Sequence, residues 1–415
     1  MISVRNRLPQ LSGNKWLLFF IAVMLLAACS PKLRPVTAPV KKQTEKEPEK
    51  KVAEKATTKP AEAKQLNIAM ILPMGLDHLK PGAKYTSAGL TKANMSVEYY
   101  QGFKMALDSL TAAGANFKLH LYDSKDDAAQ AHSLAFNPLI KNSDLIVGPV
   151  FPDGIKVFAE VLNTKAPIVS PLSPASPATI NSRNLITVMP PLEYHGWGAA
   201  QYICNKLKPK KIFILRSGFS QEQDYVRGFK NATDSLSKKK VKIITVIISK
   251  GQLAGLIPQL SKTEQNVFVV AATDQAFLSV TLRSLDTLNR HYPVVLFGHP
   301  SWEKYSFLKV DILQRLKTHI TSADQVDYKS DASMEFIRVY HRLYHVEPTD
   351  YAIKGFDEGL FFGKQLIDNN FEALDKADFT GLHNNFHFEK KGPLGWVNTH
   401  VNILMYSNFE LKQVE

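Results

Sequence analysis

The thiol of Cys29 is the side chain whose sequence surroundings define its chemistry most narrowly. It follows Leu26-Ala27-Ala28, which end an apolar run that begins at Trp16. Three basic side chains precede that run: Arg5, Arg7 and Lys15. A basic start, a short apolar run and small residues before a cleavage point are typical of a secretory signal peptide. Residues 1–28 are therefore predicted to be removed, which would leave Cys29 at the new amino terminus.

Leu26-Ala27-Ala28-Cys29 resembles the lipobox of bacterial lipoproteins. The resemblance implies that the Cys29 thiol is alkylated with diacylglycerol before the peptide is cut in front of it, and two or more acyl chains hold a protein stably on a membrane. Ser30 follows, so no Asp there resembles an inner-membrane retention signal. We expect the chain on the periplasmic face of the outer membrane rather than on the inner membrane. The open alternative is an ordinary signal peptide that happens to contain a cysteine.

A second group of candidate residues stands in Gly-, Pro- and Ser-rich breaks that each follow an apolar run. Hydroxyl groups and free backbone N–H groups in such breaks can hold an anion. A carboxylate there can pair with an ammonium group, and an aromatic ring can cover an apolar part of a ligand. The candidates for ligand binding are Asp77, Val150, Phe151, Ser170, Ser173, Phe219, Asp274, His299 and Trp302.

The elements that must position these residues alternate between strands and helices, which predicts parallel sheets covered on both faces. The first half has predicted strands at 66–73, 117–123, 145–147 and 167–171, with helices at 97–110, 127–141 and 153–162 between them. The second half repeats the rhythm, with strands at 211–215, 241–248, 266–271 and 293–298 and helices at 194–207, 223–236, 253–260 and 277–288. About 350 residues exceed a single core, so two Rossmann-like α/β lobes are expected.

Three groups of motifs resemble the type I periplasmic binding proteins, in particular the branched-chain amino-acid receptors. They are 145–150 with 166–174, 210–215 with 227–229, and 336–344 with 347–352 and 355–359. The resemblance covers residues 66–409 and implies three crossings between the lobes with a hinge at the crossings. It implies that lobe 1 is 66–190 plus 319–372 and that lobe 2 is 191–318 plus 373–415. Residues 386–388 and 401–406 are expected to form a hairpin around Gly392-Pro393.

The resemblance also implies that the ligand lies between the lobes and that Ser170 and Ser173 hold its carboxylate. The sequence departs from amino-acid receptors in two places. Gln221-Glu222 stands where receptors have Tyr-Gly, although Phe219 lies nearby and could substitute. Residues 298–302 lack the carboxylate that pairs with a ligand ammonium, which leaves Asp274 as the candidate. An unpaired buried charge is costly, so an amino-acid ligand is not established by these residues.

The distribution of charged residues along the sequence predicts a tether and does not favour a nucleic-acid partner. The chain has 51 Lys and Arg against 38 Asp and Glu, a net charge of +13. Residues 30–65 hold ten basic and five acidic side chains with almost no large apolar ones. Such a segment cannot offset its ordering entropy by burial, so 29–65 is predicted to be a lipidated cysteine followed by a disordered tether. Nucleic-acid binding would need the charge on the folded part.

Catalytic and metal-binding patterns are missing from the sequence, and neither an enzyme nor a cofactor is expected. His383 and His387 are predicted to be solvated surface residues, and Cys204 a small buried apolar residue. The first functional hypothesis is a solute-binding lipoprotein that closes on a small molecule, amino-acid-like or other, for an ABC importer with its permease. The alternative is an envelope interaction protein that regulates a peptidoglycan synthase.

Overall fold

A computed structural model describes residues 64–76, 86–377, 379–383 and 385–414. These residues lie in one compact unit, 62–415. The predicted signal peptide, Cys29 and most of the predicted tether lie outside the described residues, and so does Asp77. In the described part, no helix is long and apolar enough to cross a membrane.

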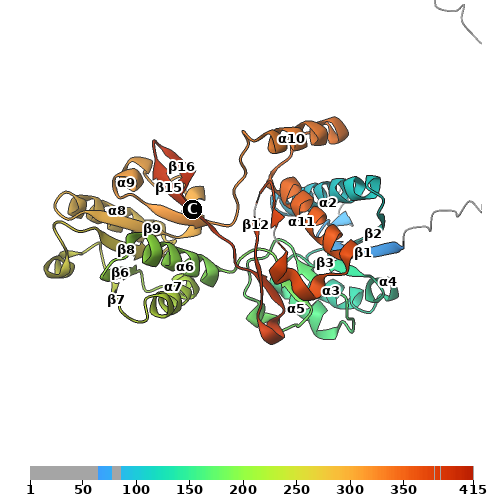
Figure 1. Cartoon of the computed structure of the whole chain (residues 1–415), viewed down its shortest axis with the longest axis horizontal. Coiled ribbons are helices and arrows are strands. Elements are labelled where there is room, and N and C mark those ends of the chain that lie inside the picture. The colour runs from blue at the N-terminus through green and yellow to red at the C-terminus, as the bar shows by residue number, and fades with distance from the viewer. Residues whose placement is uncertain (1–63, 77–85, 378, 384, 415) are drawn as a thin grey trace, which may run out of the picture. The chain divides into compact units, whose positions relative to one another are not determined.

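The first of two large sheets has the strand order β13-β14-β5-β4-β3-β1-β2. All neighbouring strands in it run parallel except the β13–β14 pair. The strands are β1 (Gln65–Leu72), β2 (Asn116–Asp123), β3 (Leu145–Val147), β4 (Ile168–Ser170), β5 (Leu185–Thr187), β13 (Phe388–Lys390) and β14 (Trp396–Asn398). The helices of this lobe are α2 (Ser87–Ala112), α3 (Ala128–Leu134), α4 (Pro138–Lys141), α5 (Pro152–Val161), α10 (Asp331–Tyr344) and α11 (Asp350–Asp368), shown in Figure 1.

The second sheet repeats this arrangement in the order β16-β15-β10-β9-β8-β6-β7. The β10–β15 and β15–β16 pairs are antiparallel, and the other neighbouring strands run parallel. The strands are β6 (Lys211–Arg216), β7 (Lys242–Ile247), β8 (Asn266–Val270), β9 (Val294–Gly298), β10 (His319–Ser322), β15 (Asn402–Ser407) and β16 (Glu410–Gln413). The helices are α6 (Leu192–Tyr202), α7 (Gln223–Leu236), α8 (Gln275–Asn289) and α9 (Val310–Arg315), with a π-helical extension of α6 at Ile203–Leu207. The predicted pair of parallel α/β lobes is confirmed.

Sheet membership corrects the predicted lobe boundaries. Strand β10, at 319–322, belongs to the second sheet, because it pairs with β9 and β15. Strands β13 and β14 belong to the first sheet, because β14 pairs with β5. The assignments of 319–322 to lobe 1 and of 388–398 to lobe 2 were therefore wrong. The chain still crosses between the sheets three times, after β5, after β10 and after β14.

Two predicted local elements also differ in the structure. The hairpin around Gly392-Pro393 exists, but Phe388–Lys390 pairs with Trp396–Asn398 rather than with 401–406. The predicted helix at 127–141 is split into α3 and α4, because Asn137 caps a new helix that has Pro138 at its first position. The segment predicted as helix at 253–260 forms a 3-10 helix, Ala254–Gln259, that contains Pro258.

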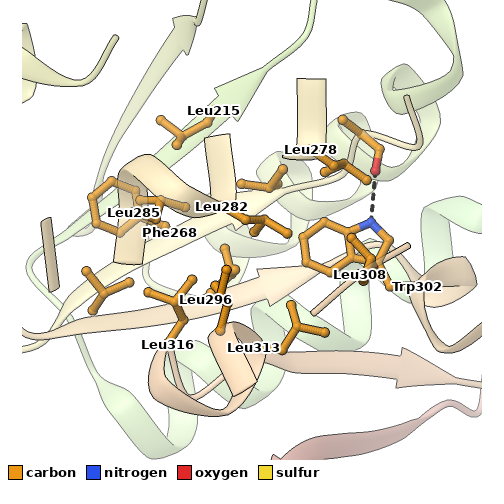
Figure 2. Packing of buried hydrophobic residues seen from close by; sticks show 14 of the residues in the cluster. Leu215, Phe268, Leu278, Leu282, Leu285, Leu296, Trp302, Leu308, Leu313 and Leu316 are labelled. Carbon is orange, nitrogen blue, oxygen red and sulfur yellow. Dashed lines mark hydrogen bonds between the residues drawn. The ribbon is translucent and has the colours of Figure 1, made fainter. Parts of the chain in front are cut away.

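Each sheet is covered by apolar side chains on both faces. In the second lobe, one core gathers leucines from the sheet, α8 and α9 around Phe268 and Trp302, as Figure 2 shows. The other face of that sheet packs on α6 and α7. In the first lobe, α2 and α11 approach closely, since a Cβ at Gly102 would lie 1.8 Å from the Ala352 carbonyl oxygen. Ligands of open α/β sheets bind beyond the carboxyl ends of the strands, so a site is expected at that edge of each sheet.

Candidate ligand-binding site

The first lobe has a hollow of about 350 Å³ at the carboxyl ends of its strands. The ring of Phe151, which precedes α5, lines it together with three carboxylates, those of Asp126, Asp127 and Asp153. The Lys92 ammonium binds the Asp126 carboxylate and lies 5.2 Å from the centre of the Phe151 ring. Asp127 caps α3 by accepting the Gln130 N–H at 2.7 Å. The hollow therefore combines an aromatic ring with an acidic wall.

The second lobe has a smaller hollow, of about 210 Å³, at the corresponding edge. It is lined by Ser217, Phe219, Gln221, Glu222, Ala272, Thr273 and Asp274. The Phe219 side chain is 54% exposed, so its ring is accessible at this hollow. Each lobe thus places one phenylalanine, Phe151 or Phe219, in a hollow beyond its strand ends.

The chain's own carboxylates occupy the backbone N–H groups after the first strand of each lobe. In the first lobe, the Asp123 carboxylate accepts N–H bonds from Met74 at 2.9 Å, Gly75 at 3.1 Å and Leu76 at 2.7 Å. Asp123 ends β2, and β1 and β2 pair directly at Leu72 and Asp123. This loop is therefore filled and has no free N–H group among those three for a ligand anion.

Glu222 has the same role in the second lobe. Its carboxylate accepts the N–H groups of Ser217 at 3.2 Å and Gly218 at 3.1 Å, and Arg216 Nε donates to it at 3.0 Å. Glu222 is 1% exposed, whereas the Arg216 side chain is 23% exposed. At the position where amino-acid receptors were expected to have Tyr-Gly, this chain thus has a buried ion pair that closes the loop after β6.

Replacing Glu222 with Ala is expected to lower the free energy of unfolding by about 2–4 kcal/mol, because breaking a buried ion pair leaves the partner charge uncompensated. The partial exposure of Arg216 to water keeps the cost at the lower end of the range for buried pairs. The matched control is Glu264→Ala, which breaks the exposed Lys210–Glu264 pair and should change stability by less than about 1 kcal/mol. Urea unfolding of residues 62–415 measures both. Equal effects of the two substitutions would contradict the assigned role of Glu222.

Three other predicted site residues, Asp274, Ser173 and His299, accept backbone N–H groups close to them in the sequence. Asp274 lines the second hollow, but its Oδ1 caps α8 by accepting the Phe277 N–H at 2.7 Å. Ser173 Oγ accepts the Ala175 N–H at 3.2 Å within its turn. His299 Nδ1 accepts the Ser301 N–H at 3.1 Å, and its side chain is buried.

Three predicted residues have almost no exposed surface. Val150 and Ser170 are each 2% exposed, so only the backbone N–H of Val150 remains as a candidate. Trp302 is 1% exposed, and its Nε1 donates to the Ala272 carbonyl oxygen at 2.9 Å. Its prediction as a ligand contact was wrong, because a 3-10 helix at Pro300–Lys304 turns its ring back onto the core. Ser170 is excluded as a side-chain contact for the same reason, burial.

The structure also places a polar cluster that the sequence did not predict, at the crossing after β10. The Lys354 ammonium of α11 binds the Asp324 carboxylate at 2.9 Å, and His383 Nε2 lies 3.8 Å from the same carboxylate. The Asp357 carboxylate accepts the N–H groups of Leu382 and His383. His383 is 4% exposed, so its prediction as a surface residue was wrong. Its neighbours come from segments distant in the sequence, which is why the sequence did not reveal it.

Glu358 lies beside this cluster, fully buried, and accepts a hydrogen bond from the Tyr99 hydroxyl at 2.9 Å. Burial raises the pKa of Glu358 well above its usual range, although Tyr99 and Lys354 oppose the shift. The folded protein therefore binds a proton there that the unfolded chain releases near pH 4.3. The stability that the protonated Glu358 contributes is fully present below about pH 4.3, and it is lost as the pH rises through the raised pKa of this carboxyl.

Glu358→Gln is therefore expected to stabilise residues 62–415 relative to wild type at pH 8 and to stabilise them by less at pH 6. The amide keeps an oxygen that accepts the Tyr99 hydroxyl but carries no charge. The urea midpoint at the two pH values measures the difference. A substitution effect independent of pH would show that Glu358 titrates normally in the folded protein.

No metal centre is present among the described residues, which contain no group of three or more His, Cys, Asp or Glu side chains able to hold an ion. Cys204, expected to be buried, is half-buried in the π-helical turn after α6. Burial raises the pKa of its thiol, which disfavours the reactive thiolate.

Comparison with solved structures identifies the fold that contains the two hollows. An ABC transporter substrate-binding protein from Desulfitobacterium hafniense, in complex with Leu, matches 85% of this chain and 100% of its own at 13% identity with a TM-score of 0.53. Another, from Sphaerobacter thermophilus, matches 85% of this chain and 96% of its own at 15% identity with a TM-score of 0.51. This chain has the type I periplasmic binding protein fold. The sequence-based resemblance is thereby confirmed at the level of fold.

A third similar structure with this binding-protein fold has a different role. It is the C-domain of LpoA (YraM) from Haemophilus influenzae, a regulator of PBP1A, which matches 84% of this chain and 100% of its own with a TM-score of 0.57. Its identity is 11%. No protein-family model and no curated protein matches the sequence. Identities this low support the shared fold alone.

Proposed function

We propose that this chain is a lipid-anchored, non-catalytic solute-binding protein of the periplasm that closes its two lobes on a small molecule. The observation that carries the proposal is the pair of hollows at the carboxyl ends of the strands, one in each lobe, each with one phenylalanine. In this binding-protein fold, hinge closure buries a ligand between such surfaces. The fold's occurrence in ABC substrate-binding proteins supports delivery to an ABC permease.

We further propose that the ligand is neutral or cationic rather than an amino acid held by its carboxylate. Asp123 and Glu222 already accept the N–H groups after β1 and β6, so these two loops do not offer those groups to an anionic ligand. Three carboxylates line the first hollow and the Lys92 ammonium neutralises only that of Asp126, so the wall has a net negative charge. A ligand with an apolar face fits the exposed ring of Phe219, and one with a cationic group fits that wall.

A screen for thermal stabilisation of residues 62–415 tests this function. A compound that binds the folded state stabilises it by about 2.7 kcal/mol at a hundredfold excess over its dissociation constant. Cationic and neutral solutes are expected to raise the melting temperature, and amino acids are not. Phe219→Ala should abolish the shift, whereas Phe409→Ala, on a ring that is 70% exposed in a turn before β16, should preserve it. Stabilisation by leucine and its analogues alone would overturn the assigned ligand class.

The second candidate is an envelope interaction protein that regulates a peptidoglycan synthase. The filled loops after β1 and β6 favour it, since a protein that recognises another protein does not need a free anion site there. The fold match to the C-domain of a PBP1A regulator supports it as well. Crosslinking in intact envelopes should then recover a synthase with this chain. Recovery of an ABC permease instead, together with a ligand shift, would favour solute binding.

Anchoring is part of both candidates and is tested separately. We propose a diacylglyceryl group on Cys29 that holds the chain on the periplasmic face of the outer membrane, with residues 30–65 as the tether. Mass spectrometry of the mature amino terminus and separation of the two membranes measure the group and its location. An unmodified Cys29 in the secreted chain would contradict the anchor without affecting the ligand screen.

A further inference from the structure

Lysine side chains gather at the amino-terminal edge of the second sheet, on the edge away from the candidate ligand site. Residues 206–264 hold 13 basic and 4 acidic side chains. The two arginines among them are paired, Arg216 with Glu222 and Arg227 with Asp224. Eight of the lysines precede or begin β6, β7 and β8, and we refer to these as the lysine surface: Lys208, Lys210, Lys211, Lys238, Lys239, Lys240, Lys242 and Lys262.

The strand pairing brings these lysines together. Lys211 and Lys242 are register partners at the starts of β6 and β7, and the Lys242 N–H donates to the Lys210 carbonyl oxygen at 3.0 Å. On its other side, β6 pairs with β8 from Ile212 and Val267 onward. The segments that lead into these three parallel strands therefore lie at one edge of the sheet. Their lysines form one surface, although more than 50 residues separate the first from the last in the sequence.

The lysine surface is exposed and only slightly neutralised. All eight side chains are exposed, and a hollow of about 650 Å³ runs beside Lys208, Lys210 and Lys211. Glu264 lies 3.2 Å from the Lys210 ammonium, and the Lys211 ammonium donates to the Gln259 carbonyl oxygen. Stabilisation of a helix dipole explains only part of the lysine surface, because that effect is limited to cations within the last turn of a helix. That accounts for Lys208 and Lys238, near the ends of α6 and α7, but not for Lys242 or Lys262.

The residue types indicate the kind of partner. Lysine is a hydrated point charge on a flexible stem, whereas arginine is favoured where individual phosphates or carboxylates are recognised by paired hydrogen bonds. A surface of lysines without arginine therefore suits a diffuse layer of many anions. Phe213, the aromatic residue beside the hollow, is 1% exposed, so the surface offers no ring on which bases of a single strand could stack.

We propose that the lysine surface docks the second lobe on a lipid bilayer that contains anionic phospholipid. The proposal rests on the anchoring part of the proposed function only in placing a bilayer within reach, since a stretched 36-residue tether extends roughly 120 Å. Anionic headgroups attract each lysine near the surface, and the attraction falls off within a Debye length. Docking is then reversible and sensitive to salt, and it leaves the carboxyl edges of both sheets available.

Flotation with vesicles tests the proposal on residues 62–415, which form a compact unit and carry neither Cys29 nor most of the tether. Binding is expected to vesicles of equimolar phosphatidylcholine and phosphatidylglycerol at low salt, and not to vesicles of phosphatidylcholine alone. The triple variant Lys238→Gln, Lys240→Gln, Lys242→Gln should bind about a hundredfold more weakly, because each lysine near such a surface contributes about fivefold.

The matched control is the triple variant Lys118→Gln, Lys156→Gln, Lys165→Gln, which removes the same charge from exposed positions of the first lobe. It should bind the mixed vesicles within about threefold of wild type, and equal urea midpoints would show that both variants fold. Equal weakening by the two variants, equal binding to both kinds of vesicle, or binding to soluble poly-glutamate without vesicle binding would each overturn the proposal. None of these outcomes bears on the group at Cys29 or on the ligand screen.

Discussion

Lowering the pH from 7 to 4 is expected to unfold residues 62–415, because four histidines are buried in the neutral form. Burial lowers the pKa of each of these to about 4: His195, His299, His319 and His383. The His299 charge further disfavours protonation of His195, and Lys354 disfavours that of His383. A folded-state pKa below the unfolded value of about 6.5 means that the unfolded chain takes up the protons first.

The sign and the size of the effect follow from this difference. The stability that neutral histidines contribute is fully present above about pH 6.5 and is lost as the pH falls toward 4. A shift from 6.5 to about 4 corresponds to about 3 kcal/mol for each histidine. The contributions of two such histidines together are comparable with the free energy of unfolding of a typical domain, about 5–15 kcal/mol. Glu303 and Glu358, whose pKa values burial raises, oppose the loss but are fewer.

His299→Asn isolates one contribution. His299 caps the 3-10 helix after β9 with a nitrogen that accepts the Ser301 N–H, so protonation would remove the acceptor. Asparagine caps equally well and does not titrate. The urea midpoint of this variant should fall less steeply than that of wild type between pH 6.5 and 4.5. Identical slopes for His299→Asn and wild type would contradict the assignment to His299.

The sequence predicted the central strands of each lobe because those strands are short apolar runs between breaks. Residues 266–270 are a short, mostly apolar run typical of a central strand, and all of them are buried in the structure. The edge elements were misassigned for a different reason. Strands β13 and β14 have three residues each, too few for a period, and β14 pairs with β5 about 210 residues earlier. Only that long-range contact decides to which sheet the segment belongs.

The sequence pointed to some residues that line the two hollows, but it did not show which backbone N–H groups the neighbouring loops leave free. Phe151, Phe219 and Asp274 do line hollows at the carboxyl ends of strands. The carboxylates of Asp123 and Glu222 were not foreseen, because the sequence shows that an acid stands near a loop but not that it turns back onto that loop's N–H groups. Which carboxylates remain free therefore depends on tertiary contacts, and these determine what ligand the lobes can bind.

Trp302→Ala is expected to lower the stability of the second lobe by about 3–5 kcal/mol, the cost of emptying a buried aromatic site. The Trp302 ring lies against Gly298, where a Cβ would approach Trp302 Cε3 to 2.3 Å, and it packs among Leu278, Leu308 and their neighbours (Figure 2). Its Nε1–H satisfies the Ala272 carbonyl oxygen. Trp302→Phe should cost less than the Ala variant, since it retains a ring and leaves only that oxygen without its donor.

The control is Trp197→Ala on α6, where the side chain is 38% exposed, so its loss should lower stability by about 1–2 kcal/mol, less than the loss of Trp302. Urea unfolding followed by circular dichroism gives the free energies, and hydrogen exchange of the β8 and β9 amides locates the loss in the second lobe. If Trp302→Ala were as mild as Trp197→Ala and instead abolished a ligand-induced thermal shift, the ring would face the ligand, as the sequence first suggested. A large loss of stability in β8 and β9 would instead establish that the segment after β9 builds the core, and the wall of the binding site would then depend on Phe219 and the loop around Asp274.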